Sequence, residues 1–227
     1  MFKKIQLVFN TIKYLKASQI LNRVKRKFIK PKVSLFNIPK NSYPHSKIKP
    51  VIQCSQRIYG KSSFKFLNKE FTLKTSEDWN TKKQDKLWLY NLHYFDDLNA
   101  INSEKRIAWH SSLIQKWIED NPLGFGNGWE PYPSSLRIVN WIKWFLLDLN
   151  SNNNVKQMWL DSLVIQTRFL SQNLEYHLLG NHLFANAKAL VFAGLFFKGE
   201  EADYWYQLGV SIINIELSEQ VLSDGGN

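Results

Sequence analysis

The sequence of 227 residues contains a single cysteine, Cys54, and only two methionines. One cysteine excludes an internal disulfide framework, although it leaves the cellular compartment open. No apolar run is long enough to cross a bilayer as a helix. Residues 3–29 also lack the separate basic region, apolar stretch and small-residue cleavage site of a signal peptide. We therefore expect a chain that is stabilised by a hydrophobic core, for which its length is sufficient.

Acidic residues are absent from the first 69 positions. This segment holds 17 of the 30 Lys and Arg residues, and the other 13 stand against all 19 Asp and Glu residues. The net charge of +11 therefore averages a strongly basic segment and a mildly acidic body. A basic segment suits nucleic acid, anionic lipid or an acidic polysaccharide. Nucleic acid is disfavoured, because the aromatic residues concentrate in the acidic body.

The pattern of residues 1–50 differs from that of the rest of the chain. Residues 3–29 place apolar side chains at helical spacing among Lys and Arg, which predicts a basic amphipathic helix interrupted near Ser18. We expect this helix to dock on the body of the protein, with contact to an anionic membrane surface as the alternative. Residues 31–50 contain four prolines and predict an extended arm. Residues 51–227 form the predicted main domain.

The main domain is predicted to be all-α with one small hairpin. Residues 58–73 predict the hairpin, with its turn at Asn68-Lys69. Residues 88–97 fit neither the helical nor the strand period. We expect them to line a pocket or cover a domain surface, or else to form an aromatic core strand with an Asp cap that begins the next helix. Helical patterns and end signals predict five helices, over residues 103–120, 134–147, 154–173, 181–197 and 200–222. Short connections between helices of alternating burial suit an α/α toroid better than a four-helix bundle.

Polar residues stand out in two places within this helical pattern. Asn181 and His182 open a helix, where Asn186 can share a face with them, and such side chains can hold a carboxylate. A helix cap is the alternative explanation. The Gly-rich loop at 124–133 lacks the Gly-Lys-Ser/Thr ending of a phosphate loop, so we expect it to present Trp129 and Glu130. Arg137 lies inside an apolar run and therefore needs a partner, such as Glu130 or an Asp, or a polar cavity.

Three motifs and the end of the chain resemble the N-terminal half of heparinase II/III-type polysaccharide lyases. The motifs are WLYNLHYFD at residues 88–96, NGWEPYPSSLRIVNW at 127–141 and LLGNHLFANAKAL at 178–190, and the chain ends with EQVLSDGGN at 219–227. The resemblance covers roughly residues 50–227. It implies an α/α toroid that is followed, in that family, by an antiparallel β-sandwich.

The resemblance also implies β-eliminative cleavage of a polysaccharide that contains uronic acid, of heparin, heparan or alginate type. Removal of the C5 proton requires stabilisation of the charge that develops on the uronate carboxylate. Asn181 would donate hydrogen bonds to this carboxylate, and His182 would help to neutralise it or act as the base. We expect substrate contacts from the following side chains: Trp129, Glu130, Arg137, His93, Asn91 and Asn186. We expect no cofactor and no metal, since His177 and His182 lack the spacing of metal ligands.

In the family, the principal catalytic Tyr lies shortly beyond the Asp-Gly-Gly motif, and this sequence ends at Asn227. Tyr176, Tyr204 and Tyr206 do not match that position. We therefore expect the chain to be the front part of a lyase, incomplete as a catalyst. The resemblance implies a periplasmic location, with a cytoplasmic or membrane-peripheral location left open.

Two rival functions remain open at this level. A glycoside hydrolase on the same toroid would need two facing carboxylates, for which Glu130 and Asp96 are the candidates. A non-catalytic module would instead bind an anionic glycan through the basic segment and the aromatic cleft.

Overall fold

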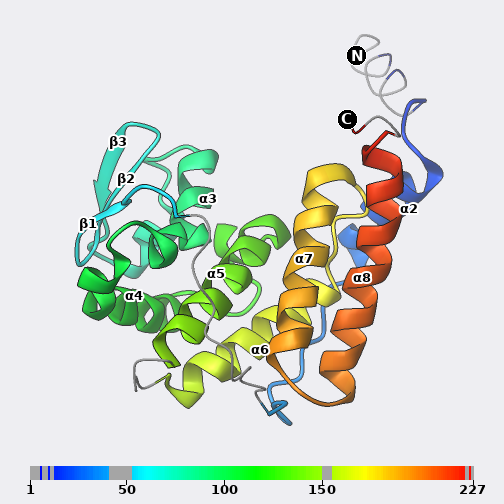
Figure 1. The fold of residues 1–227 in the computed structure, drawn as a ribbon. Helices are drawn as coiled ribbons and strands as arrows, with labels where there is room; N and C mark the ends of the chain where they lie inside the picture. Colours follow the sequence, from blue (N-terminus) through cyan, green and yellow to red (C-terminus); the bar gives the residue numbers. More distant parts are fainter. Residues whose placement is uncertain are drawn as a thin grey trace.

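A computed structural model describes residues 13–40, 53–149 and 155–222, together with the isolated residues 6, 10 and 225. Within these residues the protein has seven α-helices and one small three-stranded antiparallel sheet, which confirms the helical fold. The sheet, α3 and α4 lie at one end of the molecule, α5 and α6 in the middle, and the α7–α8 pair at the other end (Figure 1). The toroid remains a prediction. No described helix is long and apolar enough to cross a membrane.

The basic helix α2 (Ala17–Phe28) docks on the body of the protein, as predicted. It begins one residue before the expected interruption at Ser18. Lys16 Nζ lies 2.6 Å from Glu219 Oε2 on α8, and Gln19 Nε2 donates to the His177 carbonyl oxygen over 3.4 Å. Of the predicted helix that precedes α2, most residues lie outside the described part of the chain.

The arm at residues 31–40 is extended and is held by Arg168. The Arg168 guanidinium donates to the carbonyl oxygens of Ser34, Phe36 and Asn37 over 2.7–2.9 Å. It also forms two 2.7 Å hydrogen bonds with the Glu201 carboxylate. The arm is therefore a fixed part of the described fold, while its predicted continuation at 41–50 lies outside the described residues.

The predicted hairpin is part of a three-stranded sheet. Strands β1 (Ile58–Gly60), β2 (Ser63–Phe66) and β3 (Lys69–Thr72) pair in sequence order. The turn between β2 and β3 uses Leu67 and Asn68, both with positive φ, as in a type I′ turn. The turn thus lies one residue earlier than predicted, and a second hairpin was missed because its strands are very short.

Residues 88–97 do not form the core strand that was one of the two expectations for them. They contribute most of α3 (Lys86–Tyr94), whose N-cap is Asp85; the Asp85 carboxylate accepts from the Trp88 N–H over 2.9 Å. The helix ends at Phe95, which has a φ of 62°. Buried side chains on more than one side of this short helix conceal its period.

The remaining predicted helices are present with small shifts of their ends. They are α4 (Ile107–Asp120), α5 (Pro131–Leu149), α6 (Gln157–Ser171), α7 (Gly180–Phe196) and α8 (Glu200–Gln220). Asn102 makes no side-chain cap, and a 3-10 turn over Ser103–Arg106 precedes α4. Helix α5 begins at Pro131 rather than at Ser134, because proline suits the first position of a helix.

Helices α7 and α8 form an antiparallel pair joined by a short turn at Gly199 (Figure 1). Two glycines permit their close approach. A Cβ atom at Gly194 would lie 2.6 Å from the Tyr206 backbone nitrogen, and one at Gly209 would lie 2.7 Å from the Ala187 carbonyl oxygen. Helix α7 is buried along most of its length, and only its first turn and one side reach the groove described below.

Candidate functional site

Asn181 lies in the first turn of α7 with its side chain exposed. It is not the N-cap, because that position is held by Leu179. Leu179 and Gly180 both have positive φ, and the Gly180 N–H donates to Glu216 Oε2 over 3.0 Å. The free backbone donor is thus satisfied by a carboxylate from α8. Within the described part of the chain the exposed Asn181 amide has no hydrogen-bond partner, so it can contact a ligand, and the capping alternative for this residue is wrong.

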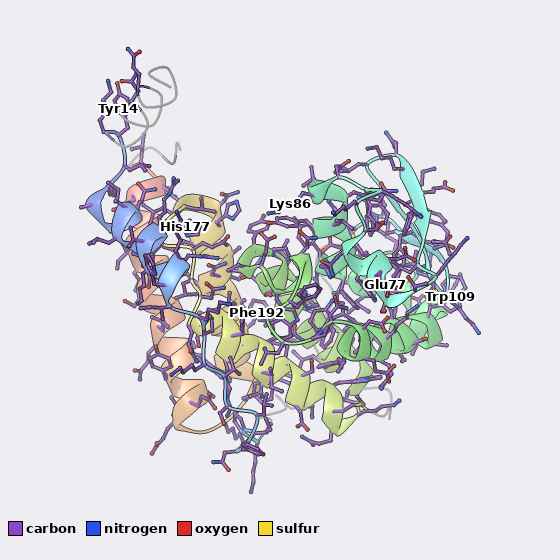
Figure 2. The ribbon with its side chains drawn as sticks, turned by 180° about the vertical axis from the view of Figure 1, so that it is seen from behind. Tyr14, Glu77, Lys86, Trp109, His177 and Phe192 are labelled. Carbon is purple, nitrogen blue, oxygen red and sulfur yellow. The ribbon has the colours of Figure 1, made fainter. Side chains whose placement is uncertain are left out.

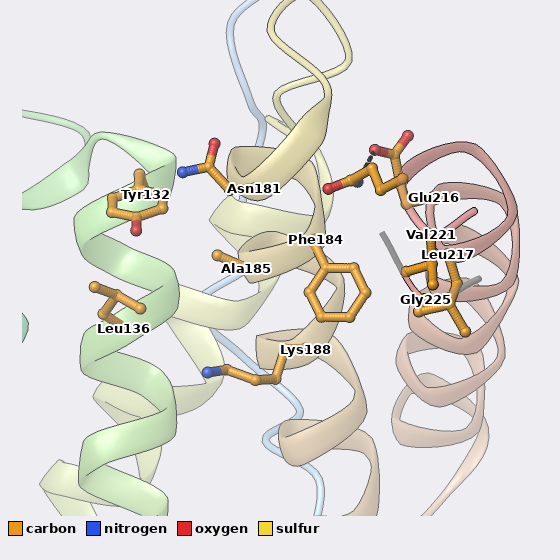
Figure 3. Close-up of a pocket in the computed structure, with 11 residues that line it drawn as sticks. Tyr132, Leu136, Asn181, Phe184, Ala185, Lys188, Glu216, Leu217, Val221 and Gly225 are labelled. Carbon is orange, nitrogen blue, oxygen red and sulfur yellow. Dashed lines mark hydrogen bonds between the residues drawn. The ribbon is translucent and has the colours of Figure 1, made fainter. Parts of the chain in front are cut away.

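A groove of about 390 Å³ runs beside Asn181 between α5, α7 and α8. Asn181, Ala185 and Lys188 share one side of α7, as their spacing on a helix requires. Figure 3 shows these three side chains facing Tyr132 and Leu136 of α5, while Phe184 lies toward α8. Lys188 was not anticipated. Burial and the nearby charge of Lys143 lower the pKa of Lys188, against the opposing effect of Asp96.

His182 is next to this groove and contacts two elements. Its ring centroid is 4.5 Å from that of Tyr132, and its Nδ1 is 3.3 Å from Glu175 Oε1. The side chain of His182 is 33% exposed, whereas that of Glu175 is 8% exposed. In the tautomer in which Nδ1 carries the proton, His182 donates to the Glu175 carboxylate and its Nε2 can accept from another partner.

Asn186 lies behind this pair and is fully buried. Its Nδ2 donates to Glu175 Oε2 over 3.1 Å and to Ser135 Oγ over 3.0 Å, and its Oδ1 accepts from the Glu175 N–H over 2.8 Å. The expected substrate contact is therefore corrected: Asn186 positions Glu175, and through it His182. Glu175 was missed because it lies in an irregular segment without a periodic pattern.

A series of aromatic rings leads from α3 to His182. The ring centroids of Tyr90 and Tyr94 are 6.5 Å apart, and those of Tyr94 and Tyr132 are 6.0 Å apart. The flat faces of such rings suit stacking against a sugar. Sequence reasoning expected Trp129 in this role and did not single out Tyr132, although Tyr132 lies inside the motif at 127–141.

Glu130 is half-buried at the side of this aromatic series. Its carboxylate accepts a hydrogen bond from the Tyr90 hydroxyl and lies 2.9 Å from Lys86 Nζ. Burial and this carboxylate raise the pKa of Tyr90. Asn91 is also half-buried, and its Nδ2 donates to the Leu87 carbonyl oxygen over 2.8 Å within α3. Glu130 keeps an exposed side, whereas the Asn91 donor group is already in use.

Trp129 and His93 are core residues, and their expected substrate contacts are corrected to packing. Trp129 is 5% exposed, and its Nε1 donates to the Asn121 carbonyl oxygen over 3.1 Å. His93 is fully buried, with Nδ1 accepting from Trp117 Nε1 over 3.0 Å and Nε2 lying 3.1 Å from the Trp79 carbonyl oxygen. Burial, and then the charge of Arg137, lowers the pKa of His93 to about 3.

Arg137 is also fully buried, without the carboxylate partner that was expected. Its guanidinium donates to Gln166 Oε1 over 2.8 Å, and to the His93 carbonyl oxygen and Ser134 Oγ over 3.3 Å each. Its Cζ lies 3.8 Å from the centre of the Trp117 ring. In the described part of the chain, neutral acceptors and a ring therefore hold this charge, so the predicted pair with Glu130 or an Asp is wrong.

Among the residues that the structure describes, no group of three or more His, Cys, Asp or Glu side chains is arranged to hold a metal ion. The chemically available groups are those around the groove, namely the Asn181 amide, the His182–Glu175 pair, the Tyr132 ring and the Lys188 amine.

Comparison with known proteins agrees with the motifs. The profile of the family described as Heparinase II/III N-terminus matches residues 9–227. A heparin-sulfate lyase of Pedobacter heparinus is 27% identical over 161 residues, which cover 65% of this chain and 24% of that protein. A heparin-sulfate lyase of Bacteroides stercoris is 33% identical over 177 residues, which cover 65% of this chain and 26% of that protein.

The chain thus spans about a quarter of the length of these curated relatives. No solved structure matches it at a significant level. The family match extends over nearly the whole sequence, including the groove and its flanking residues. The chain therefore belongs to the heparinase II/III family of polysaccharide lyases, of which it carries the N-terminal region.

Proposed function

We propose that this chain provides the uronate-binding part of a lyase that cleaves an acidic polysaccharide by β-elimination. The observation that carries the proposal is the exposed Asn181 amide at a groove, next to a histidine that a buried carboxylate orients. The two heparin-sulfate lyase relatives favour a heparan-like substrate over an alginate-like one.

The chemistry assigns a separate task to each group. Asn181 donates hydrogen bonds to the uronate carboxylate and stabilises the negative charge that it gains as the C5 proton leaves. Glu175 accepts from His182 Nδ1, so Nε2 can accept the C5 proton or, once protonated, share in neutralising the carboxylate. As the C5 proton leaves, its electron pair forms the C4–C5 double bond and the bond from C4 to the glycosidic oxygen breaks; that oxygen takes a proton from protonated His182 or from water, which leaves an unsaturated uronide.

The walls of the groove suit the rest of such a substrate. Tyr132 offers a ring for stacking on a sugar, and Lys188 offers a cation farther along the same side of α7. The seven positions between Asn181 and Lys188 correspond to a rise of about 10 Å along the helix. This distance exceeds the length of one sugar ring, so Lys188 would meet an anionic group on a neighbouring sugar.

Product analysis tests the proposal. We expect this chain, once extended through the β-sandwich of its family, to release unsaturated uronides from heparan sulfate, detected by their near-ultraviolet absorbance. Asn181→Ala should lower this rate by about a hundredfold or more, as is typical when one donor to a developing charge is removed. Asn91→Ala is the matched control, since that amide is engaged within α3. Equal rates for Asn181→Ala and the unaltered chain would remove Asn181 from the mechanism.

A second candidate is a module that binds an anionic glycan without cleaving it. It is favoured by one observation, that the groove and the basic segment both lie in a chain that spans a quarter of its relatives' length. Glycan binding without any new product would support it. New reducing ends without ultraviolet absorbance would instead indicate a hydrolase, whose candidate carboxylates Asp96 and Glu130 contact Asn140 and Lys86 respectively.

A further inference from the structure

A second hollow lies where α2 meets the segment that leads into α7. It measures about 500 Å³ and is lined by Arg23, Val24, Arg26, Lys27 and His177. Figure 2 shows His177 at this junction, on the side of the molecule where α2 packs. Three of the five lining side chains are cationic, and none is a carboxylate. We call this hollow the α2 cradle.

The α2 cradle is fixed in place by bonds to the body of the protein. Arg26 Nη1 donates to the Asn173 carbonyl oxygen over 3.4 Å and lies at the same distance from His177 Nδ1. Gln19 and Lys16 attach the first turn of α2 to His177 and Glu219. The arginine is therefore held in a defined orientation, with neutral groups as its contact partners in the described part of the chain.

The field inside the cradle is positive. Burial, followed by the charges of Arg26 and Arg23, lowers the pKa of His177 to about 4. His177 is thus neutral at physiological pH, and its unprotonated Nδ1 can accept from Arg26. Arg side chains bind sulfate and carboxylate groups well, because their planar forks donate two parallel hydrogen bonds. The cradle has the charge, the donors and the volume for such an anion.

The position of the cradle connects it to the groove. His177 lies two residues after Glu175 and five residues before His182. Glu175 and Glu130 are the carboxylates whose charges act on Arg26 from farther away. The segment of residues 175–182 therefore contributes His177 to the cradle and Asn181 to the groove.

We propose that the α2 cradle binds a sulfate or carboxylate group of the same polysaccharide that occupies the groove. This subsite rests on the proposed function, and it assigns to the basic N-terminal segment the recognition of a densely anionic, sulfated chain. An anionic membrane surface is the competing partner for α2, since Leu21 and Phe28 are exposed. The cradle is concave and is hydrogen-bonded to the body of the protein, so it suits a single anionic group better than it suits a flat lipid surface.

Binding measurements on matched variants test this subsite. The probe is a heparan tetrasaccharide, sulfated or fully desulfated, titrated calorimetrically into the chain. The variant is Arg23→Gln/Lys27→Gln, and the control is Lys25→Gln/Lys30→Gln, which removes the same charge from exposed residues outside the cradle. We expect the cradle variant to bind the sulfated probe about tenfold more weakly and the control less than about twofold more weakly. Circular dichroism and thermal unfolding confirm that both variants fold.

His177 provides a direct spectroscopic readout. Binding of the sulfated probe should raise the pKa of His177, measured from its ring proton shifts, and the desulfated probe, which keeps only its carboxylates, should raise it less. Equal losses of affinity in the two double variants, or an unchanged His177 pKa, would overturn the subsite. If the cradle variant lost binding to phosphatidylserine vesicles but still bound the tetrasaccharide like the unaltered chain, α2 would be assigned to a membrane instead.

Failure of the subsite can be told apart from failure of the lyase proposal. If no unsaturated product forms but the cradle variant still loses affinity, the lyase proposal fails and the subsite stands. If the product forms at an equal KM in the cradle variant and the control, the subsite fails and the lyase proposal stands.

Discussion

At the scale of single residues, the buried polar side chains of this protein differ in the groups that form hydrogen bonds with them. Arg137 uses neutral oxygens and the Trp117 ring, while Asn186 uses its whole amide on Glu175 and Ser135. Both side chains are fully buried, so neither reaches a ligand in the groove. Asn181, five positions from Asn186 on the same helix, keeps its amide free at the groove.

His93 gives the stability of the protein a specific dependence on pH. Its pKa is about 3 in the fold and about 6.5 in the unfolded chain. Because the folded value is depressed, the stabilisation is complete above pH 6.5 and is lost as the pH falls toward 3. Between pH 7 and pH 5 this residue alone should remove about 2 kcal/mol from the free energy of unfolding.

The His93→Gln variant tests this linkage. We expect lower stability than that of the unaltered chain at pH 7, but a smaller further loss between pH 7 and pH 5, measured by urea unfolding. Between pH 7 and pH 9 the two proteins should change in parallel, which serves as the internal control. An equally steep loss in both proteins below pH 7 would show that other groups cause the acid sensitivity.

Much of the site could be read from residue types, and part of it could not. Asn181 and His182 stand out because polar residues at the start of an apolar helix demand a reason. His93 and Trp129 belong to equally polar or Gly-rich motifs, yet both are core residues: a Cβ at Gly128 would lie 2.7 Å from His93 Nδ1. That close packing depends on contacts between α3 and the loop before α5, which local sequence does not reveal.

At the scale of elements, helices were predictable where one side is exposed or a cap is visible. Helix α3 was not predictable, because it has only nine residues and its buried side chains, which include Trp88, Leu92 and His93, lie on more than one side of it. The sheet was predictable as a hairpin, but its short first strand pairs through only two registered residue pairs and leaves little pattern. Burial on several sides thus conceals the helical period of α3, and shortness conceals the strand period of β1.

The α7–α8 contact makes Gly194 sensitive to the addition of one methyl group. In an open helix, Gly→Ala stabilises by about 1 kcal/mol. Here the added Cβ would meet the backbone of Tyr206 at 2.6 Å, so Gly194→Ala should destabilise by about 1–3 kcal/mol. Chemical unfolding measures whether Gly194→Ala lowers or raises the free energy of unfolding, and Ser211→Ala, at an exposed position of α8, is the control. A stabilised Gly194→Ala protein would mean that the two helices separate without cost.

At the scale of the whole molecule, Arg168 joins the arm to α6 and α8. Arg168→Gln removes its hydrogen bonds to three arm carbonyl groups and to Glu201. We expect chymotrypsin to cut after the exposed Phe36 about tenfold faster in this variant, because local release of the arm becomes easier. Arg23→Gln is the control, and unchanged cleavage after Phe36 would show that the arm is held mainly by its partly buried Val33 and Ile38.

The docking of α2 also has a consequence for biosynthesis. Lys16 and Glu219, which form an ion pair, are 203 positions apart in the sequence. A ribosome that adds about 5–20 residues per second needs on the order of ten seconds or more to deliver α8 after α2 has emerged. During this interval the basic, amphipathic helix lacks the part of its docking surface that α8 provides, and it can meet anionic RNA or chaperones. The Lys16–Glu219 ion pair can therefore form only after α8 has been made.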